Sequence, residues 1–181
     1  MNILVATDGA LEPDTVVETM QRVYRDGDNV MVFTAVNLPR DLLRRLGAHG
    51  VEEAARIAHE AGATLSAGDR SAERLRATAP APSGPNSDPT LVSALAATAH
   101  GRTKPIVDAL KAEGIPSKGL WLSSEYRTAK TILTSARAHD ADLIIIGSHG
   151  TGGHEGALGS TGTKLVRQAK ANVLVLRTPT G

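Results

Sequence analysis

A glycine-rich segment near the end of the chain carries the residue types best suited to bind a ligand. Six of the thirteen residues in 147–159 are glycine, and Ser160 and Thr161 follow directly. Glycine lets backbone N–H groups approach an anion closely. The segment leads into a predicted helix that begins near Ser160, where the first N–H groups lack intrahelical acceptors and the helix dipole is positive. This pattern is typical of a phosphate site, to which Thr163 and Lys164 add a hydroxyl and a charge.

Two familiar phosphate-binding motifs are absent from this segment. The pattern GxxxxGK[ST] fails because Gly162, Thr163 and Lys164 stand in the wrong order. The pattern GxGxxG fails because Glu155 stands where the last glycine is needed. Neither a P-loop NTPase nor a dinucleotide-dependent oxidoreductase is therefore predicted. The alternative to a phosphate site is a flexible glycine-rich turn capped by Ser160.

Catalytic and metal-binding groups are not predicted in this segment. His149 and His154 lie within it, but no third ligand accompanies them, so we expect no metal site built from protein ligands. The histidines are scattered and none stands beside a motif serine, so no Ser/His/Asp triad is predicted. We predict no catalytic residue and, at most, slow hydrolysis of a bound phosphate ester.

Strands and helices that alternate along the chain must position these residues. Short apolar runs rich in β-branched residues predict five buried strands, over 3–7, 30–36, 119–123, 143–146 and 173–176. The spacing of apolar residues predicts one helix that begins at Pro13 and four others over 42–65, 91–113, 129–138 and 160–171. Within 91–113, Pro105 predicts a break or a new helix start. The predicted fold is α/β, an open five-stranded parallel sheet that is doubly wound, with helices on both faces.

The predicted sheet places two polar turns at one edge. In open parallel sheets a ligand binds beyond the carboxyl ends of the strands, where the strand order reverses. The first strand ends at Thr7-Asp8-Gly9, and the fourth runs into the glycine-rich segment. Asp8 is either a ligand contact or an ordinary turn residue.

The whole chain is expected to form one domain, residues 1–181. A tract rich in proline, alanine and serine, 77–89, predicts a long flexible insertion at about residues 67–90. No run of about 18 apolar residues is present. No basic leader precedes Ile3, so we expect a cytoplasmic location.

Composition excludes several classes of function. Aromatic residues make up only 2% of the chain and the formal net charge is +1. The chain therefore lacks both the basic surface and the stacking platform of a nucleic-acid-binding protein, and nothing indicates a membrane surface as partner. It has no cysteine, which excludes disulfides and thiolate chemistry.

Two segments of the sequence resemble the universal stress protein family. They are NILVATDGA at residues 2–10 and DLIIIGSHG, followed by GALGSTGTKLVRQAKANVLVLR, at residues 142–177. The ATP-binding members of that family carry a glycine, two residues, a glycine, nine residues and then Gly-Ser or Gly-Thr. Gly147, Gly150 and the pair Gly159-Ser160 match this pattern. The resemblance implies a Rossmann-like fold of the adenine nucleotide alpha hydrolase type.

The resemblance also implies a ligand and roles for particular residues. The ligand would be ATP, ADP or AMP, accompanied by Mg²⁺, in a regulatory stress-response protein. Asp8 would contact the ribose or adenine side, the backbone at Ala35 and Val36 would hold the adenine, and the glycine-rich segment would hold ribose and phosphates. The implied nucleotide-binding set is Thr7, Asp8, Ala35, Val36, Ile146, Gly147, His149, Gly150, Gly159, Ser160 and Thr161. The family also often forms homodimers through its last strand, here 173–176.

Two departures from the family pattern keep an alternative open. Only eight residues separate Gly150 from Gly159, and Gly162 stands where a hydroxyl residue is common. The alternative is a protein of the same fold that binds no nucleotide and acts through dimerisation and partner binding. A third hypothesis is an enzyme on a similar sheet, such as a nucleotidyl transferase or a relative of the electron-transfer flavoproteins.

Overall fold

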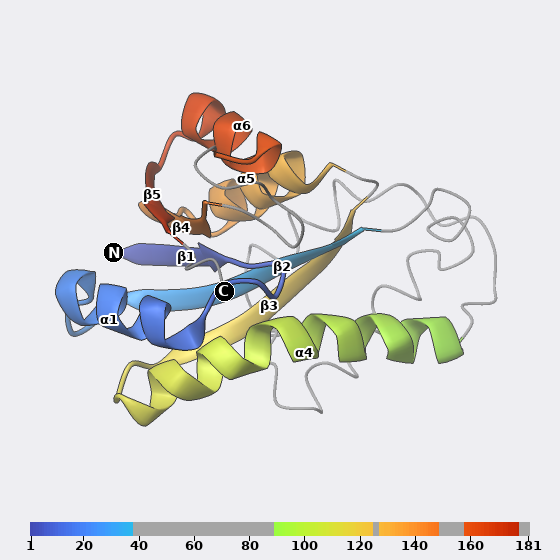
Figure 1. Cartoon of the computed structure of the whole chain (residues 1–181), viewed down its shortest axis with the longest axis horizontal. Helices are drawn as coiled ribbons and strands as arrows, with labels where there is room; N and C mark the ends of the chain where they lie inside the picture. Colours follow the sequence, from blue (N-terminus) through green and yellow to red (C-terminus); the bar gives the residue numbers. More distant parts are fainter. Residues whose placement is uncertain (38–88, 125–126, 149–157, 178–181) are drawn as a thin grey trace.

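A computed structural model describes residues 1–37, 89–124, 127–148 and 158–177 (Figure 1). The described strands are β1 (Asn2–Ala6), β2 (Asn29–Asn37), β3 (Ser117–Ser124), β4 (Leu143–Gly147) and β5 (Asn172–Leu176). The described helices are α1 (Pro13–Val23), α4 (Pro89–Ala112), α5 (Thr128–Ala138) and α6 (Ser160–Gln168). All five predicted strands are confirmed within a few residues of their expected bounds.

The five strands form one sheet in the order β3-β2-β1-β4-β5, and every pair is parallel. β1 pairs with both β2 and β4, so the strand order reverses at β1 and β4. In Figure 1, α1 and α4 lie on one face of the sheet while α5 and α6 lie on the other. The predicted doubly wound α/β sheet is therefore confirmed.

The side chains of the strands form two separate apolar layers, one on each face of the sheet. Because successive residues of a strand point to opposite faces, Ile3 and Val5 face α1 and α4 whereas Leu4 faces α5 and α6. Strands covered on both faces are apolar throughout. Accordingly, the central strand residues Ile3, Leu4, Val5, Ile144 and Ile145 have no exposed surface.

Two predicted boundaries were wrong. Pro105 neither breaks nor starts a helix, because α4 continues through it from Pro89 to Ala112. Pro105 and Gly101 are exposed, so water can satisfy the Gly101 carbonyl that has lost its amide donor. The last helix, predicted to reach residue 171, ends at Gln168, where Ala169 adopts an extended conformation and donates its N–H to Leu165.

Other predictions fall on residues that the structure does not describe. The predicted helix over 42–65 lies wholly outside the described ranges, as does the predicted insertion at 67–90 except for the residues that begin α4. Within the described ranges, no helix is both long enough and apolar enough to span a membrane.

Candidate functional site

The carboxyl ends of β1 and β4 lie side by side. Ala6 of β1 pairs with Ile146 of β4, so Thr7 and Gly147 are the next residues on each strand. Neighbouring strands are about 4.8 Å apart. The structure therefore places Thr7 and Asp8 at the same edge as Ile146 and Gly147, at the point where the strand order reverses.

The turn after β1 is stabilised by its own side chains. The Thr7 hydroxyl accepts a hydrogen bond from the Gly9 N–H at 3.0 Å, and the Asp8 carboxylate accepts one from the Ala10 N–H at 3.1 Å. Gly9 has φ of 101°, which a residue with a side chain rarely adopts. Asp8 thus stabilises the turn, which is compatible with a ligand contact, and the turn fixes its half-buried carboxylate at the carboxyl edge of the sheet.

One hydrogen bond closes the two ends of the glycine-rich segment. The Gly159 N–H donates to the Ser148 carbonyl at 3.1 Å, and the Ser148 N–H donates to the Leu176 carbonyl of β5 at 2.7 Å. The start of α6 is therefore held against the carboxyl end of β4. His149 and Gly150, which the sequence also placed in the site, lie outside the described residues.

The first turn of α6 presents backbone donors at this edge that have no acceptor among the described residues. Its N-cap, Gly159, provides no side-chain hydrogen bond, and the first intrahelical bond runs from the Thr163 N–H to the Gly159 carbonyl at 2.9 Å. Within the described parts of the chain, no acceptor is recorded for the N–H groups of Ser160, Thr161 and Gly162. Three N–H groups at the positive end of a helix can bind an anion.

Only some of the hydroxyl groups near this turn are available to a ligand. Ser160 is exposed and Thr161 is half-buried. Thr163 instead donates its hydroxyl to the Leu158 carbonyl at 3.2 Å, which stabilises the start of the helix. The expectation that Thr163 adds a donor to the site is therefore not met in this structure.

Gly162 is a packing residue. A Cβ atom built on it would lie 2.5 Å from Leu158 Cδ1, 2.9 Å from Leu158 Cγ and 3.3 Å from Ile146 Cδ1. A side chain at this position would therefore have to displace the Leu158 side chain, which precedes α6, and would press on the tip of Ile146 in β4. This contact gives a physical reason for glycine at a position where the family often has a hydroxyl residue.

β2 extends past the end of β1. The last residue of β1, Ala6, pairs with Phe33, whereas β2 continues to Asn37 beside β3. Ala35 and Val36 therefore lie at the carboxyl edge beyond the end of β1. As whole residues they are buried, with only 6% and 4% of their surface exposed.

Arg102 of α4 also reaches this edge, although no sequence pattern indicated that it would. Its Nη1 atom donates to the Ala35 carbonyl at 3.4 Å. Its Cγ atom lies 3.3 Å from the position that a Cβ on Gly9 would occupy. On an alanine-rich helix with several charges, an arginine is most simply a solvated residue, and no local pattern links position 102 to positions 9 and 35.

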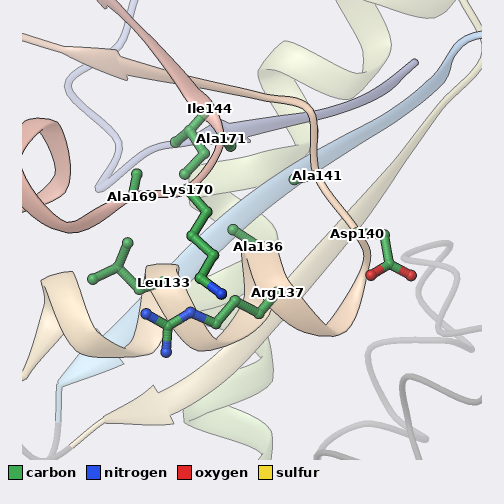
Figure 2. A pocket seen from close by; sticks show the side chains of 9 residues that line it. All are labelled: Leu133, Ala136, Arg137, Asp140, Ala141, Ile144, Ala169, Lys170 and Ala171. Carbon is green, nitrogen blue, oxygen red and sulfur yellow. The ribbon is translucent and has the colours of Figure 1, made fainter.

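A surface pocket of about 360 Å³ lies elsewhere, between α5 and the segment that joins α6 to β5 (Figure 2). It is lined by Leu133, Ala136, Arg137, Asp140, Ala141, Ile144, Ala169, Lys170 and Ala171. Asp140 and Ala141 precede β4, and Ala169–Ala171 precede β5, so the pocket lies toward the amino ends of these strands. The pocket is on the face of the sheet that α5 and α6 cover (Figure 1), at the opposite end of the strands from the candidate site.

No group of three potential metal ligands was found within the described ranges.

The fold is shared with solved universal stress proteins. UspA from Lactobacillus plantarum is 20% identical with a TM-score of 0.58, covering 98% of this chain and 97% of that chain. A family member from Arabidopsis thaliana with AMP bound is 9% identical with a TM-score of 0.53, covering 99% and 93%. The Archaeoglobus fulgidus protein in complex with dAMP is 17% identical with a TM-score of 0.50, covering 97% and 96%.

Sequence comparison assigns the family directly. No curated protein matches the chain. The profile of the universal stress protein family, however, matches residues 1–177, which is nearly the whole length. Together with the parallel five-stranded sheet, this match shows that the chain belongs to the universal stress protein family.

Proposed function

We propose that this stress-response protein binds an adenine nucleotide at the carboxyl edge of β1 and β4 and acts as a regulatory module. The observation that carries the proposal is the first turn of α6. Its first three N–H groups, for which the described ranges hold no acceptor, are positioned beside β4 by the hydrogen bond between Gly159 and Ser148. Such a turn suits a phosphate group.

The proposed nucleotide extends from α6 toward β2. Its phosphates lie at Gly159, Ser160 and Thr161, its ribose lies near Asp8, and its adenine lies along the backbone of Ala35 and Val36. β2 and β4 are separated by one strand, or about 10 Å. That span suits a nucleoside monophosphate whose base lies at β2 and whose phosphate lies beside β4.

The comparisons support adenine over other bases. The Arabidopsis and Archaeoglobus proteins of the same fold were solved with AMP and dAMP. The glycine pattern of the family favours ATP with Mg²⁺, which is a larger ligand than AMP. Mg²⁺ commonly keeps several waters and needs one or two protein carboxylates, and Asp8 is a carboxylate at this edge.

Calorimetric titration of the nucleotide-stripped protein tests this proposal. ATP and AMP in the presence of Mg²⁺ should bind with micromolar dissociation constants, and adenosine should bind more weakly because it lacks the phosphate. Absence of heat with all three ligands, confirmed by equilibrium dialysis with labelled ATP, would overturn the proposal.

The second candidate function, interaction through a homodimer, rests on the position of β5. β5 ends the sheet, and among the described strands it pairs only with β4. Its residues Val173, Leu174 and Val175 are half-buried rather than buried. An apolar edge strand with unpaired backbone groups favours pairing with another chain, and a second copy offers the same edge.

Replacing Val175 with proline should disrupt such a dimer without disturbing the sheet. The Asn172 N–H donates to Asp142 on the β4 side, at 3.0 Å, so the Val175 N–H three residues later points to the free edge. Proline is tolerated in an edge strand when the lost N–H faces outward. We expect the dimer dissociation constant to rise at least about tenfold, since an interface hydrogen bond is lost from each copy.

Sedimentation velocity over a concentration series measures this effect. Val175→Thr keeps the N–H group and the shape of the side chain, and it should leave the dimer intact. Equal dimerisation of Val175→Pro and the wild type would place the interface elsewhere. A wild type that remains monomeric at high micromolar concentration would exclude the homodimer.

A further inference from the structure

The Ala35 carbonyl is an acceptor that the sheet itself does not use on its β1 side. Phe33 accepts a hydrogen bond from the Thr7 N–H at 2.9 Å, so its carbonyl points toward β1. Carbonyls two residues apart in a strand point the same way. The Ala35 carbonyl therefore points past the end of β1, into the space at the carboxyl edge.

Arg102 fills part of that space. Its donor reaches the Ala35 carbonyl at 3.4 Å, which is a long hydrogen bond. Its stem packs beside Gly9, where the absence of a Cβ makes room for the Arg102 Cγ. The ion pairs recorded within the described ranges, Met1 with Asp28 and Lys104 with Asp108, do not involve it. Among the described residues, the guanidinium is thus a partly buried cation held at this edge by one weak hydrogen bond.

We propose that Arg102 is a specificity-determining residue that weakens binding of 6-amino purines and favours 6-oxo purines. The inference rests on the proposed function, which places the base along the backbone of Ala35 and Val36. An adenine amino group needs an acceptor, and Arg102 already donates to one of the two lone pairs of the nearest one, the Ala35 carbonyl. The guanidinium has five N–H donors and no acceptor, so it cannot pair with an amino group.

A 6-oxo purine presents a hydrogen-bond acceptor where adenine presents a donor. Its carbonyl oxygen is an acceptor in the place of the amino group, and Arg102 can donate to it without leaving the Ala35 carbonyl. The adenine amino group must share the Ala35 carbonyl with a cationic donor that repels it, whereas the hypoxanthine oxygen can accept a hydrogen bond from the same guanidinium. The wild-type site should therefore discriminate only weakly between AMP and IMP.

Replacement of Arg102 with alanine tests the inference by the ratio of two affinities. We expect Arg102→Ala to bind AMP about threefold more tightly and IMP about threefold more weakly, the size of one long hydrogen bond in each case. The AMP to IMP selectivity should thus rise about tenfold. Lys104→Ala is the matched control, because it removes one positive charge from the same helix at an exposed ion pair with Asp108. It should leave the AMP to IMP selectivity unchanged.

Each alternative result has a distinct meaning. If Arg102→Ala weakens AMP and IMP equally, the guanidinium contacts the phosphate or the ribose, and the inference is overturned. An unchanged ratio with binding intact also overturns it while leaving the proposed function in place. If no variant binds either nucleotide, the proposed function fails and the inference falls with it.

A second measurement examines the Arg102 contact without a ligand. The Val36 amide nitrogen belongs to the same peptide group as the Ala35 carbonyl, so its ¹⁵N chemical shift reports hydrogen bonding to that carbonyl. Arg102→Ala should shift the Val36 resonance in the ligand-free protein, and Lys104→Ala should not. An unmoved Val36 resonance in Arg102→Ala would contradict the contact on which the inference depends.

Discussion

Gly159→Asp is expected to abolish nucleotide binding while it leaves the protein folded and slightly more stable. Aspartate is a favoured N-cap residue, and Gly159 already has the extended conformation of an N-cap, with φ of −57° and ψ of 161°. A built Cβ meets only the Ser148 carbonyl oxygen, at 3.8 Å, an ordinary contact distance. The carboxylate should therefore cap α6 and add about 0.5–1 kcal/mol to the free energy of unfolding.

The same carboxylate would compete with the ligand. It would accept hydrogen bonds from the N–H groups that the phosphate needs, and it would repel the phosphate charge. Two like charges about 4–5 Å apart near a protein surface repel by about 3 kcal/mol. Nucleotide affinity should fall at least about a hundredfold.

Calorimetry with AMP and thermal unfolding measure the two effects on one sample. Gly159→Asn provides the matched control, because asparagine caps a helix about as well as aspartate without the charge. We expect Gly159→Asn to bind AMP more tightly than Gly159→Asp. Wild-type affinity in Gly159→Asp would show that the phosphate does not lie at the start of α6.

The sequence predicted the sheet well because its strands are chemically unambiguous. The run at 143–146, for example, is short, apolar throughout and has three consecutive isoleucines, which favours a strand covered on both faces. The prediction at Pro105 was wrong because it considered only the free energy that a proline costs an isolated helix. In the protein that cost is offset by the burial of Ile106, Val107 and Leu110 in the turns around it.

The candidate site was predictable where it depends on local chain geometry. Thr7, Asp8 and Gly147 lie at strand ends, so the strand assignments alone place them at one edge. Thr163 was misjudged because a threonine hydroxyl in the first turn of a helix can bond either a ligand or a nearby carbonyl, and here it bonds Leu158. Arg102 could not be found because its position depends on how α4 packs against β2 and on the turn that follows β1.

Gly162 shows a second limit of prediction from sequence, because its role depends on how closely Leu158 and Ile146 pack against it. In the sequence, glycine at this position was a departure that favoured a protein without nucleotide binding. In the structure, a side chain at this position would displace Leu158 and press on Ile146 of β4, which gives a packing reason for glycine there.

Gly162→Val is expected to destabilise the protein by about 3 kcal/mol. A branched side chain would overlap Leu158 and Ile146, and overpacking of a buried site typically costs about 1–3 kcal/mol, to which valine adds its poorer helix propensity. For a chain of this size the melting temperature should fall by roughly 10 °C. Thermal and urea unfolding measure the change.

Gly101→Ala is the matched control for Gly162→Val, because Gly101 also lies inside a helix but a Cβ on it would meet nothing within 4 Å. Gly101→Ala should gain about 0.5–1 kcal/mol from helix propensity alone. Unchanged stability in Gly162→Val would contradict the packing of α6 on β4. That packing also holds the first turn of α6 beside β4, so Gly162→Val should lose AMP affinity together with stability, whereas Gly159→Asp should lose affinity alone.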